Sequence, residues 1–515
     1  MIKKVLLILT ILLLICSCKD NKKVEIDNTD DNYRVFYEIF VGSFSDSNND
    51  GIGDLRGIIN RLDYMNDGNI NSSDSLGIQG IWLTPIFYSP SYHKYDVVDY
   101  YRIDPSFGTQ EDLDELIQKC HERNILVILD LAINHTSSQN EWFKQFNLAH
   151  QNNDRNNKYF DYYTYVNSND SFSGSFCDLE YTDQKYECNF SYDMPELNFD
   201  NENVRNEVLN IAKYYLDKGV DGFRFDAAKY IYLTDGEASV DFWKWYTEKL
   251  REIKEDIYLV GEVWSGEGEI ARYQTEMDCF DFKASQADGI IAKTAKSQDI
   301  NAFTSYVVNY QQSLASISKE RMPIFFISNH DMDRSAGYLN AANGQAYMGA
   351  NLYLLSPGSP FIYYGEEIGM KGSRGGSNTD ANRRLAMLWG DDDTVKNPEG
   401  STYELKNQIN GTIKDQLKDN NSLLKHYSKL IMIRKKYPQI ARGEYTMLDL
   451  GQADLGGFKI AYEEETTYIV HNNSDHEITI RSDNFTQMLE SCGFSSASFK
   501  NNELKIGPYT SAILK

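Results

Sequence analysis

Three acidic side chains, Asp226, Glu262 and Asp331, stand at or just after the ends of three different short apolar segments. An isolated acid in such a place is usually a helix cap or a surface charge, but three acids in equivalent places are hard to obtain by chance. Carboxyl groups crowded into one cleft raise the pKa of at least one of them, so one can stay protonated while another is ionised. The three acids therefore predict a site for acid/base and nucleophilic chemistry.

The apolar segments that carry these acids belong to a series in which β-rich runs alternate with amphipathic helical stretches. The runs are residues 35–44, 77–85, 125–133, 219–226, 257–264, 279–285, 322–330 and 360–367. Nearly continuous apolar strands separated by helices indicate a parallel sheet covered on both faces, and eight such units indicate a closed barrel. We therefore expect an α/β protein built on a (β/α)8 TIM barrel, with the three acids at the carboxyl ends of strands, facing the mouth.

Two regions break this alternation. Residues 137–203 are rich in Asn, Asp, Tyr and Gly and show no long helical period, which predicts a loop-rich domain inserted after the third strand. Residues 445–515 contain alternating apolar and polar positions around turn signals, which predicts a C-terminal antiparallel β-domain. The catalytic barrel is then expected to comprise residues 33–136 and 204–444.

The first residues are typical of a secretion signal rather than of a folded element. Two lysines precede an apolar run at residues 5–15, which has the length of a signal peptide and is too short to span a bilayer comfortably. The small residue before Cys18 resembles a bacterial lipobox, which implies cleavage that removes residues 1–17 and acylation of the Cys18 thiol. We expect an extracytoplasmic lipoprotein of the cell envelope, anchored to the membrane through a flexible tether of residues 18–32. The alternative is an ordinary secretory signal with an incidental cysteine.

Composition restricts the possible partners. The net charge of −25 disfavours nucleic acid, because binding would lack the counterion release that a basic surface supplies. Cys177 and Cys188 lie near each other in a loop-rich region and form either a disulfide in an oxidising compartment or two free thiols. We expect a monomer.

The segment "DSNNDGIGDLRG", residues 46–57, has the spacing of an EF-hand calcium loop over its first nine positions. The expected Ca²⁺ ligands are Asp46, Asn48, Asp50, the carbonyl of Ile52, and Asp54. The twelfth position is Gly57 instead of the bidentate Glu, and the preceding segment is β-rich rather than helical, which argues against a calcium sensor. A structural calcium site is the interpretation that the spacing favours, and a metal-free turn rich in Asp and Asn is the alternative.

Several motifs occur in a fixed order along the chain. The principal ones are "DLAINH" (130–135), "GFRFDAAK" (222–229), "GEVW" (261–264) and "NHD" (329–331). Further ones are "GIQGIWLTPI" (77–86), "HKYDVVDYYRIDP" (93–105) and "MPELN" (194–198). From about residue 33 to 445 the chain resembles the α-amylase superfamily of glycoside hydrolases, and the seven segments make the resemblance specific.

The resemblance implies a role for each acid. Asp226 matches the nucleophile that forms a covalent glycosyl-enzyme, Glu262 the general acid/base, and Asp331 the third acid, which binds sugar hydroxyls. Retaining hydrolysis of this kind needs two carboxyl groups about 5–5.5 Å apart, one ionised and one protonated. Arg224 stands two residues before Asp226 and points to the same side of the strand, so it can hold that carboxylate ionised.

The resemblance also implies sugar-binding residues. His135 and His330 match donors to sugar hydroxyls beside the scissile bond, and Tyr95, with its neighbour His93, matches the aromatic platform under the sugar on the non-reducing side. Lys229 matches a basic residue on the leaving-group side. Amylases often carry His directly after that Lys, where this chain has Tyr230, which leaves one leaving-side contact open. Similar loops in oligo-1,6-glucosidase relatives hold Ca²⁺ at the position of residues 46–57, and Asn134 resembles a ligand of a second calcium site.

The motifs favour an α-amylase that cleaves α-1,4 bonds of starch, glycogen or maltooligosaccharides, because "HKYD", "FDAAK" and "GEVW" are amylase-like. Other segments, including "MPELN" and "NRRLAMLW" (382–389), resemble oligo-1,6-glucosidases and neopullulanases. Bond preference and transglycosylation therefore stay open. A non-catalytic glucan-binding lipoprotein is disfavoured, because such proteins usually lose one of the acids and this chain keeps all three.

Overall fold

The computed structural model describes residues 29–70, 72–171, 173–404 and 410–515. The expected signal peptide, most of the tether and Cys18 lie outside the described residues. Within the described ranges, none of the helices combines the length and the hydropathy that crossing a bilayer requires.

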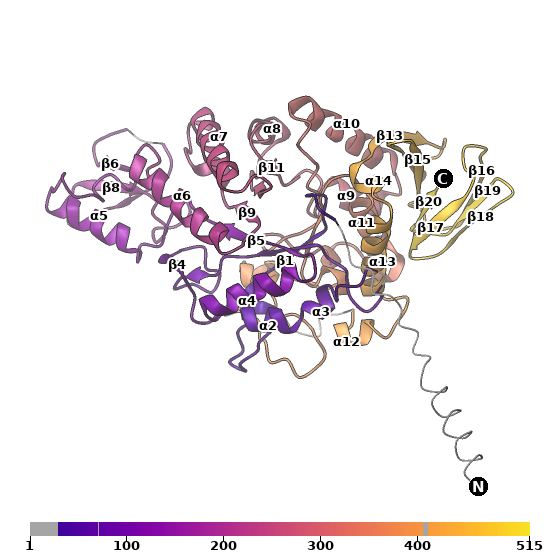
Figure 1. Cartoon of the computed structure of the whole chain (residues 1–515), viewed down its shortest axis with the longest axis horizontal. Helices are drawn as coiled ribbons and strands as arrows, with labels where there is room; N and C mark the ends of the chain where they lie inside the picture. The colour runs from indigo at the N-terminus through magenta and orange to yellow at the C-terminus, as the bar shows by residue number, and fades with distance from the viewer. Residues whose placement is uncertain (1–28, 71, 172, 405–409) are drawn as a thin grey trace, which may run out of the picture.

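A parallel sheet of seven strands forms most of the barrel wall, in the order β11-β10-β9-β5-β2-β1-β12. Figure 1 shows β1, β5, β9 and β11 in the middle of the molecule, with helices around them. The strands are β1 Phe36–Ile39, β2 Gly80–Leu83, β5 Leu126–Leu131, β9 Gly222–Phe225, β10 Tyr258–Gly261, β11 Asp278–Cys279 and β12 Phe361–Tyr363. Residues 323–327 occupy the eighth position, since Ile324 pairs in parallel with Phe280 and the Phe361 N–H donates to the Phe325 carbonyl across 2.9 Å. The predicted (β/α)8 barrel is confirmed.

Amphipathic helices cover the outside of the barrel. The longer ones are α4 Gln110–His121, α6 Glu202–Asp217, α7 Gly236–Ile253, α10 Asn301–Ile317, α11 Gln345–Leu354 and α13 Leu423–Lys436. The shorter ones are α2 Leu55–Asn60, α3 Leu62–Met65, α8 Glu267–Tyr273, α9 Ile290–Ser297, α12 Ile413–Gln416 and α14 Gln439–Arg442. Single 3₁₀ turns are η1 Val41–Ser43, η2 Ala228–Tyr230, η3 Ser335–Gly337, η4 Ala341–Asn343, η5 Glu366–Ile368, η6 Gly375–Ser377 and η7 Asp380–Arg383.

Helix α4 shows why these helices form where they do. Thr109 and Asp112 make a reciprocal capping box at its start, and Leu113, Leu116 and Ile117 bury one face.

Aromatic side chains fill the inside of the barrel. Phe36 and Phe361, on the adjacent strands β1 and β12, stack with ring centroids 4.7 Å apart. Gly80 on β2 allows this packing, because a Cβ there would lie 2.3 Å from the Phe36 ring. Trp82 and Phe280 complete the layer, both nearly fully buried. The barrel interior is therefore a packed floor, and the acids at the strand ends stand on it.

The segment inserted after β5 contains a helix and a small sheet. Helix α5 Glu141–Gln151 precedes an antiparallel sheet of β6 Tyr165–Asn167, β8 Gln184–Glu187 and β7 Phe176–Asp178, in that order. Helix α5 was not anticipated from the sequence; Asn140 caps it, and Phe143 and Phe146 give it a buried face. Of the two alternatives for the cysteines, the structure contains the disulfide, Cys177–Cys188. A separate hairpin of β3 Phe87–Tyr88 and β4 Asp99–Ile103 stands beside the barrel mouth.

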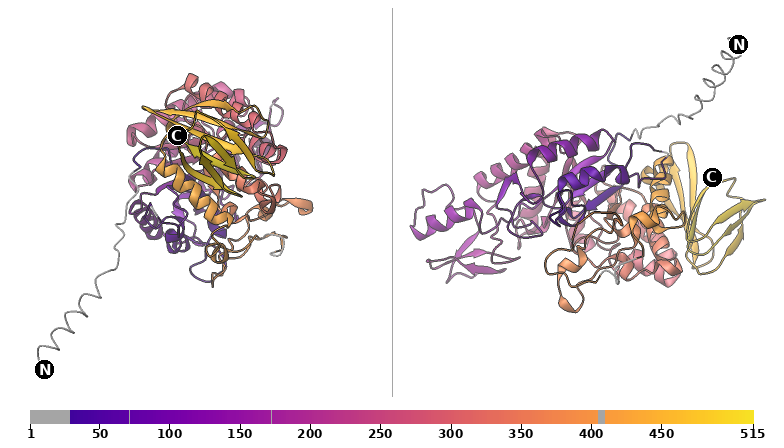
Figure 2. Two further views of the ribbon diagram at one scale, coloured as in Figure 1. Left: turned by 90° about the vertical axis from the view of Figure 1, so that its right-hand side faces the viewer. Right: turned by 90° about the horizontal axis from the view of Figure 1, so that it is seen from below.

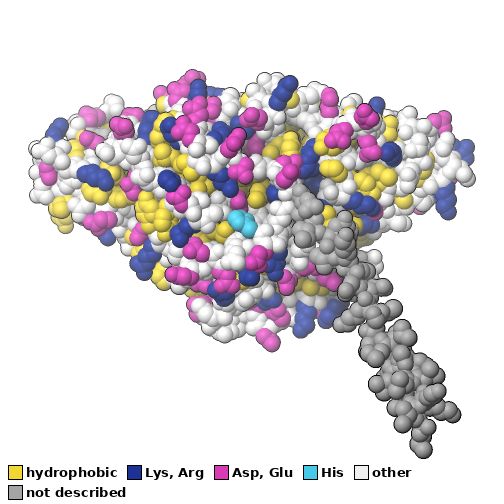
Figure 3. Space-filling model, viewed as in Figure 1, with side chains coloured by type: hydrophobic (Ala, Val, Ile, Leu, Met, Phe, Trp, Pro, Cys, Tyr) yellow, Lys and Arg dark blue, Asp and Glu magenta, His cyan; other side chains and the backbone are white. Residues whose placement is uncertain are grey.

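The C-terminal part forms the expected antiparallel β-domain. One sheet has the order β13-β14-β15-β20-β17 and the other β16-β19-β18. Their bounds are β13 Glu444–Asp449, β14 Leu455–Tyr462, β15 Glu465–Asn472, β16 Ile478–Arg481, β17 Met488–Gly493, β18 Ala497–Lys500, β19 Glu503–Ile506 and β20 Thr510–Leu514. The domain lies at the opposite end of the molecule from the inserted segment (Figures 1 and 2). On the face that Figure 3 shows, acidic and basic side chains are interspersed.

Candidate active site

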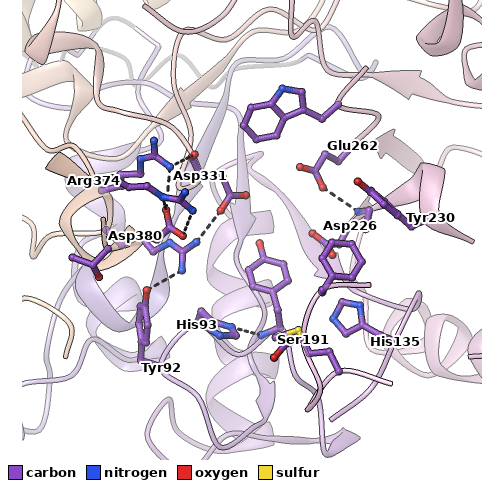
Figure 4. Close-up of a pocket in the computed structure, with 18 of the residues that line it drawn as sticks. Tyr92, His93, His135, Ser191, Asp226, Tyr230, Glu262, Asp331, Arg374 and Asp380 are labelled. Atoms are coloured by element: carbon purple, nitrogen blue, oxygen red, sulfur yellow. Dashed lines mark hydrogen bonds and ion pairs between the residues drawn. The ribbon is translucent and has the colours of Figure 1, made fainter. Parts of the chain in front are cut away.

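The carboxyl ends of the barrel strands open into a cavity of about 940 Å³ (Figure 4). Its lining comprises Tyr92, His93, Tyr95, His135, Phe190, Ser191, Met194, Asp226, Ala227, Lys229, Tyr230, Glu262, Trp264, Gln286, Asp331, Arg374, Asn378, Thr379, Asp380, Arg383 and Arg384. All three predicted catalytic acids and most of the predicted sugar-binding residues are in this set. The other two, Arg224 and His330, lie beneath the surface and contact the acids from below.

Arg224 joins the acids of three neighbouring strands. It lies on β9, is 1% exposed, and its Nη1 lies 2.6 Å from Asp226 Oδ1 and 2.9 Å from Asp130 Oδ1. Its Nη2 lies 2.9 Å from Glu262 Oε2. A planar guanidinium can contact several carboxylates at once, whereas a single ammonium cannot. One buried cation therefore fixes the positions of Asp226 and Glu262 relative to each other.

The backbone after Asp226 adds a second support. Ala227 has a left-handed conformation with φ of 49°, which is uncommon for a residue with a side chain and costs free energy. In this conformation its N–H donates to Glu262 Oε2 across 3.0 Å. The tight turn thus directs a backbone donor from the end of β9 at the acid that follows β10.

Burial sets the protonation of the two central acids. It raises the pKa of Asp226 to about 6, against the opposing charge of Arg224, so Asp226 is mostly ionised at neutral pH. Burial also raises the pKa of Glu262, Arg224 opposes this, and the negative charges of Asp226 and Asp331 raise it further. A carboxyl group surrounded by two others favours its protonated form. The arrangement therefore supplies an ionised Asp226 next to a Glu262 that tends to keep its proton.

Asp331 belongs to a different charge network. Its Oδ2 lies 3.0 Å from His330 Nε2, and its Oδ1 accepts a hydrogen bond of 2.8 Å from Arg384. Burial opposes the charge on His330, but Asp331 and Glu38 outweigh it and raise the His330 pKa to about 10. Burial likewise opposes the charge on Asp331, and the two cations hold the pKa of this acid well below its usual range. Asp331 is thus a permanent anion at the mouth.

Tyr95 connects the two networks. Its hydroxyl donates to Asp130 Oδ2 across 2.9 Å and lies 2.7 Å from His330 Nε2. Its ring stacks on the His330 imidazole, with centroids 5.5 Å apart and planes at 11°. The Tyr95 ring is therefore rigidly held at the cavity wall, as a platform for a sugar requires.

The two other histidines present neutral rings. Burial lowers the pKa of His93 and of His135 to about 4. His93 Nδ1 accepts a hydrogen bond from the Tyr95 N–H across 3.2 Å. His135 lines the cavity, and its buried Nε2 has no hydrogen-bond partner among the residues that the structure describes. An unpaired ring nitrogen at this place can bond a ligand hydroxyl.

Lys229 and several aromatic rings form one side of the cavity. Lys229 Nζ donates to the Trp264 carbonyl across 2.8 Å, and Trp264 is 39% exposed. Tyr230, which stands where amylases often carry His, packs edge-on against Phe190 with centroids 4.9 Å apart. This side offers flat apolar surfaces to a bound molecule.

Ion pairs form the opposite side. Arg374 makes a two-pronged contact with Asp380, through Nε at 2.6 Å and Nη2 at 2.7 Å (Figure 4). Arg383 contacts Asp380 at 3.0 Å and Asp333 at 2.8 Å, and its Nη1 donates to the Asp331 carbonyl across 2.6 Å. These residues create a polar wall next to Asp331.

The sequence reasoning missed Asp130, Glu38 and Arg384 as parts of the site. Asp130 accepts hydrogen bonds from Trp82, Tyr95 and Arg224, and Glu38 Oε1 lies 2.6 Å from His330 Nδ1. A signal existed for two of them, since a charged residue inside an apolar strand run must have a buried partner. Arg384 lies in a segment whose sequence gives no indication of what its side chain contacts.

The five expected calcium ligands Asp46, Asn48, Asp50, Ile52 and Asp54 lie in the loop between η1 and α2. The Asp46 carboxylate accepts the Gly51 N–H at 2.7 Å and the Thr394 hydroxyl at 2.6 Å, and Asp54 caps α2 by accepting the Gly57 N–H at 2.6 Å. The oxygen donors are of the hard type that Ca²⁺ prefers. In the part of the chain that the structure describes, no three His, Cys, Asp or Glu side chains are placed to share an ion, so a site here depends on the Asn48 amide and the Ile52 carbonyl.

Known proteins resemble the chain over most of its length. The family described as "Alpha amylase, catalytic domain" matches residues 38–443. "Alpha-amylase 3" of Dictyoglomus thermophilum is 37% identical over 486 residues, which cover 93% of each chain. "Oligo-1,6-glucosidase" of Bacillus cereus is 29% identical, over 86% of this chain and 90% of that protein. Among solved structures, "Eubacterium rectale Amy13B" superposes with a TM-score of 0.88 at 34% identity, over 96% of this chain and 97% of that one.

Proposed function

The chain belongs to the alpha-amylase family of glycoside hydrolases, and we propose that it cleaves internal α-1,4-glucosidic bonds of starch, glycogen or maltooligosaccharides with retention of configuration. The observation that carries the proposal is the single guanidinium of Arg224, which contacts both Asp226 and Glu262 at the base of one cavity. Because one guanidinium contacts both carboxyl groups, the two acids flank the same point of the cavity, which supports the paired nucleophile and acid/base of a retaining enzyme.

In the first step the Asp226 carboxylate attacks the anomeric carbon and forms an ester bond to it. The bond to the leaving oxygen breaks, and that oxygen takes the proton of Glu262. In the second step the ionised Glu262 removes a proton from water, whose oxygen attacks the anomeric carbon and breaks the ester to Asp226. His135 and Asp331 bind hydroxyls of the same sugar, and Tyr95 lies under its ring.

Two variants test this assignment. Glu262→Gln cannot donate a proton, so we expect kcat on soluble starch to fall by about 10³-fold or more, with the fold intact by circular dichroism. Asp226→Asn cannot form the ester and should be at least equally impaired. Full activity of either variant would refute the mechanism. Proton NMR of the first product from maltopentaose should show the α-anomer.

A second candidate is an exo-acting α-glucosidase, and the ion-pair wall beside Asp331 favours it. Arg374, Asp380 and Arg383 line the cavity next to Asp331 as an ion-paired group, on the side where the resemblance places the non-reducing end of the donor. The 29% identical Bacillus cereus protein is described as an oligo-1,6-glucosidase. Products from amylose, pullulan and isomaltose distinguish the two. Maltooligosaccharides of mixed length as early products support the amylase, and glucose as the sole early product supports the glucosidase. In the latter case Arg374→Ala, which opens the wall, should add longer products.

We further propose that residues 46–57 hold a structural Ca²⁺ through Asp46, Asn48, Asp50, the Ile52 carbonyl and Asp54, with water completing the shell. Hydrogen bonds from Thr394 and from backbone N–H groups lower the pKa of Asp46 although burial opposes them, so its carboxylate is ionised at neutral pH, as a Ca²⁺ ligand must be. The ion would clamp the loop between the first strand and α2 and take no part in the chemistry.

Membrane attachment through an acylated Cys18 also stays a proposal. It rests on the lipobox-like sequence before that residue. A Cys18→Ala variant that still partitions with membranes after expression in a bacterium would refute it, and release into the soluble fraction would support it.

A further inference from the structure

A second hollow of about 420 Å³ lies on the outside of the barrel, between helices α8 and α10. Its lining comprises Glu267, Gly268, Ile270, Ala271, Gln274, Asp281, Lys283, Tyr306, Asn309, Tyr310 and Ser313. None of these side chains has a part in the site described above. We call this hollow the α8–α10 groove.

The groove adjoins the active-site cavity along two stretches of chain. Trp264 lines the cavity and Glu267, three residues later, lines the groove; Gln286 lines the cavity and Lys283, three residues earlier, lines the groove. Three residues span at most about 10 Å, so the two hollows are separated by a single ridge.

Trp264 lies on the cavity side of that ridge. Its indole is 39% exposed and stacks on the buried Phe282 ring, with centroids 5.0 Å apart and planes at 15°. One face is thus fixed by packing on Phe282, whose chain neighbours Asp281 and Lys283 line the groove, and the exposed remainder provides a flat surface in the cavity wall. An indole ring that is exposed on one face and held in place on the other is the type of surface on which the apolar face of a sugar ring stacks.

The groove has the chemistry of a carbohydrate site rather than that of an anion or lipid site. Its charges are internally paired, since Lys283 Nζ lies 2.7 Å from Glu267 Oε2 and the Tyr306 hydroxyl donates to Asp281 across 2.7 Å. The Gln274 amide donates to the Tyr310 hydroxyl across 2.9 Å. Amide, hydroxyl and paired carboxylate groups offer both donors and acceptors, which suits sugar hydroxyls.

We propose that the α8–α10 groove binds glucosyl units of a long α-glucan on the reducing-end side of the cut, after the chain has passed over Trp264. The direction follows from Lys229, which the family resemblance assigns to the leaving-group side and whose Nζ donates to the Trp264 carbonyl. The proposal rests on the proposed function, and it deepens that function by assigning long polymers, rather than short oligosaccharides, as the preferred substrates.

The test compares substrates of different length in matched variants. Asn309 and Gln312 are both exposed on α10, but only Asn309 lines the groove. Asn309→Trp fills the groove, and Gln312→Trp is the control. We expect the ratio of kcat/KM on maltoheptaose and amylose to that on maltotetraose to fall about fivefold in Asn309→Trp, the effect of about one lost hydrogen bond, and to stay at the wild-type value in Gln312→Trp.

Ser313→Trp is a second way to fill the groove, should Asn309→Trp fold poorly. Calorimetric titration of a Glu262→Gln background should show that either blocking variant weakens maltoheptaose binding more than maltotetraose binding. If both blocking variants keep the wild-type ratio and affinities, the groove assignment is wrong while the proposed function stands. If the wild-type protein cleaves none of these α-1,4-glucans, the proposed function fails, irrespective of the variants.

Discussion

His330 and Glu38 form a buried contact of 2.6 Å between Nδ1 and Oε1, at the end of β1 and directly below Asp331. Both side chains are nearly inaccessible to solvent. Because Glu38 and Asp331 lie on opposite nitrogens of one imidazole, they keep it charged and fix its ring plane, and that plane supports Tyr95. The position of the Tyr95 ring at the cavity wall therefore depends on Glu38, which does not itself line the cavity.

We expect Glu38→Gln to lower the pKa of His330 from about 10 toward its ordinary value, because the amide removes one of the two negative charges that oppose burial. His330 would then lose its proton at a lower pH, and the alkaline limit of kcat/KM should move down by about one pH unit or more. NMR titration of the histidine ring measures the shift directly. An unchanged His330 titration in the folded variant would contradict the role given to Glu38.

Arg224→Lys should inactivate the protein although the charge is kept. One ammonium cannot contact Asp226, Glu262 and Asp130 together, so we expect kcat to fall by about 10²–10³-fold and unfolding free energy by about 3 kcal/mol, because buried carboxylates lose their partner. Urea unfolding and starch hydrolysis measure the two effects. Arg56→Lys, at an exposed pair with Asp112, is the matched control and should change stability by less than about 1 kcal/mol. Near-normal activity of Arg224→Lys would mean that the guanidinium does not organise the acids.

Because of the buried Glu366, we expect the free energy of unfolding to decline as pH rises. Burial raises its pKa to about 7, although Tyr353, Tyr427 and Ser328 donate hydrogen bonds to it. Since the folded state favours the protonated form, this contribution to stability is complete below about pH 4.5 and is lost as pH rises through about 7, amounting to about 3 kcal/mol.

Glu366→Gln should remove this dependence, because an amide oxygen can still accept both tyrosine hydroxyls and carries no charge to bury. We expect the variant to gain stability over the wild type between about pH 5 and 8 in urea titrations. The exposed Glu464→Gln serves as control. If the difference in unfolding free energy between Glu366→Gln and the wild type does not change with pH, Glu366 does not titrate in this range.

Calcium removal should lower stability without altering the chemistry. If residues 46–57 hold the ion, exhaustive chelation should lower Tm by about 2–5 °C, and added Ca²⁺ should restore it. Asp50→Ala should show a lower Tm that no longer responds to Ca²⁺, whereas Asp67→Ala, at another exposed acid, should respond as the wild type does. A transition that is identical with and without chelator would count against the site.

The sequence sufficed for the barrel and for the identity of the three acids, because apolar strands and acids at strand ends leave a periodic local signal. Asp130 and Glu38 could be seen as charges within strands, but their partners come from segments far away in the chain, and only the closed barrel brings them into contact. Helix α5 was missed although its signals are local, since Asn140 is an N-cap and Phe143, Phe146 and His150 are spaced as on one helical face. The Cys177–Cys188 bond likewise required the hairpin geometry.

The aromatic floor of Phe36, Trp82, Phe280 and Phe361 has one more consequence. These rings close the bottom of the active-site cavity. The water of the second step must therefore enter through the same opening by which the leaving chain departs. Under the proposed function, a leaving chain that Trp264 and the α8–α10 groove retain would delay the entry of water to the glycosyl-enzyme, and its free hydroxyl could attack the glycosyl-enzyme and reform the bond. If the proposed groove binds glucan, the residence time of the leaving chain beside Trp264 would set the partition between hydrolysis and glycosyl transfer, and substrate length would then affect the outcome of the reaction.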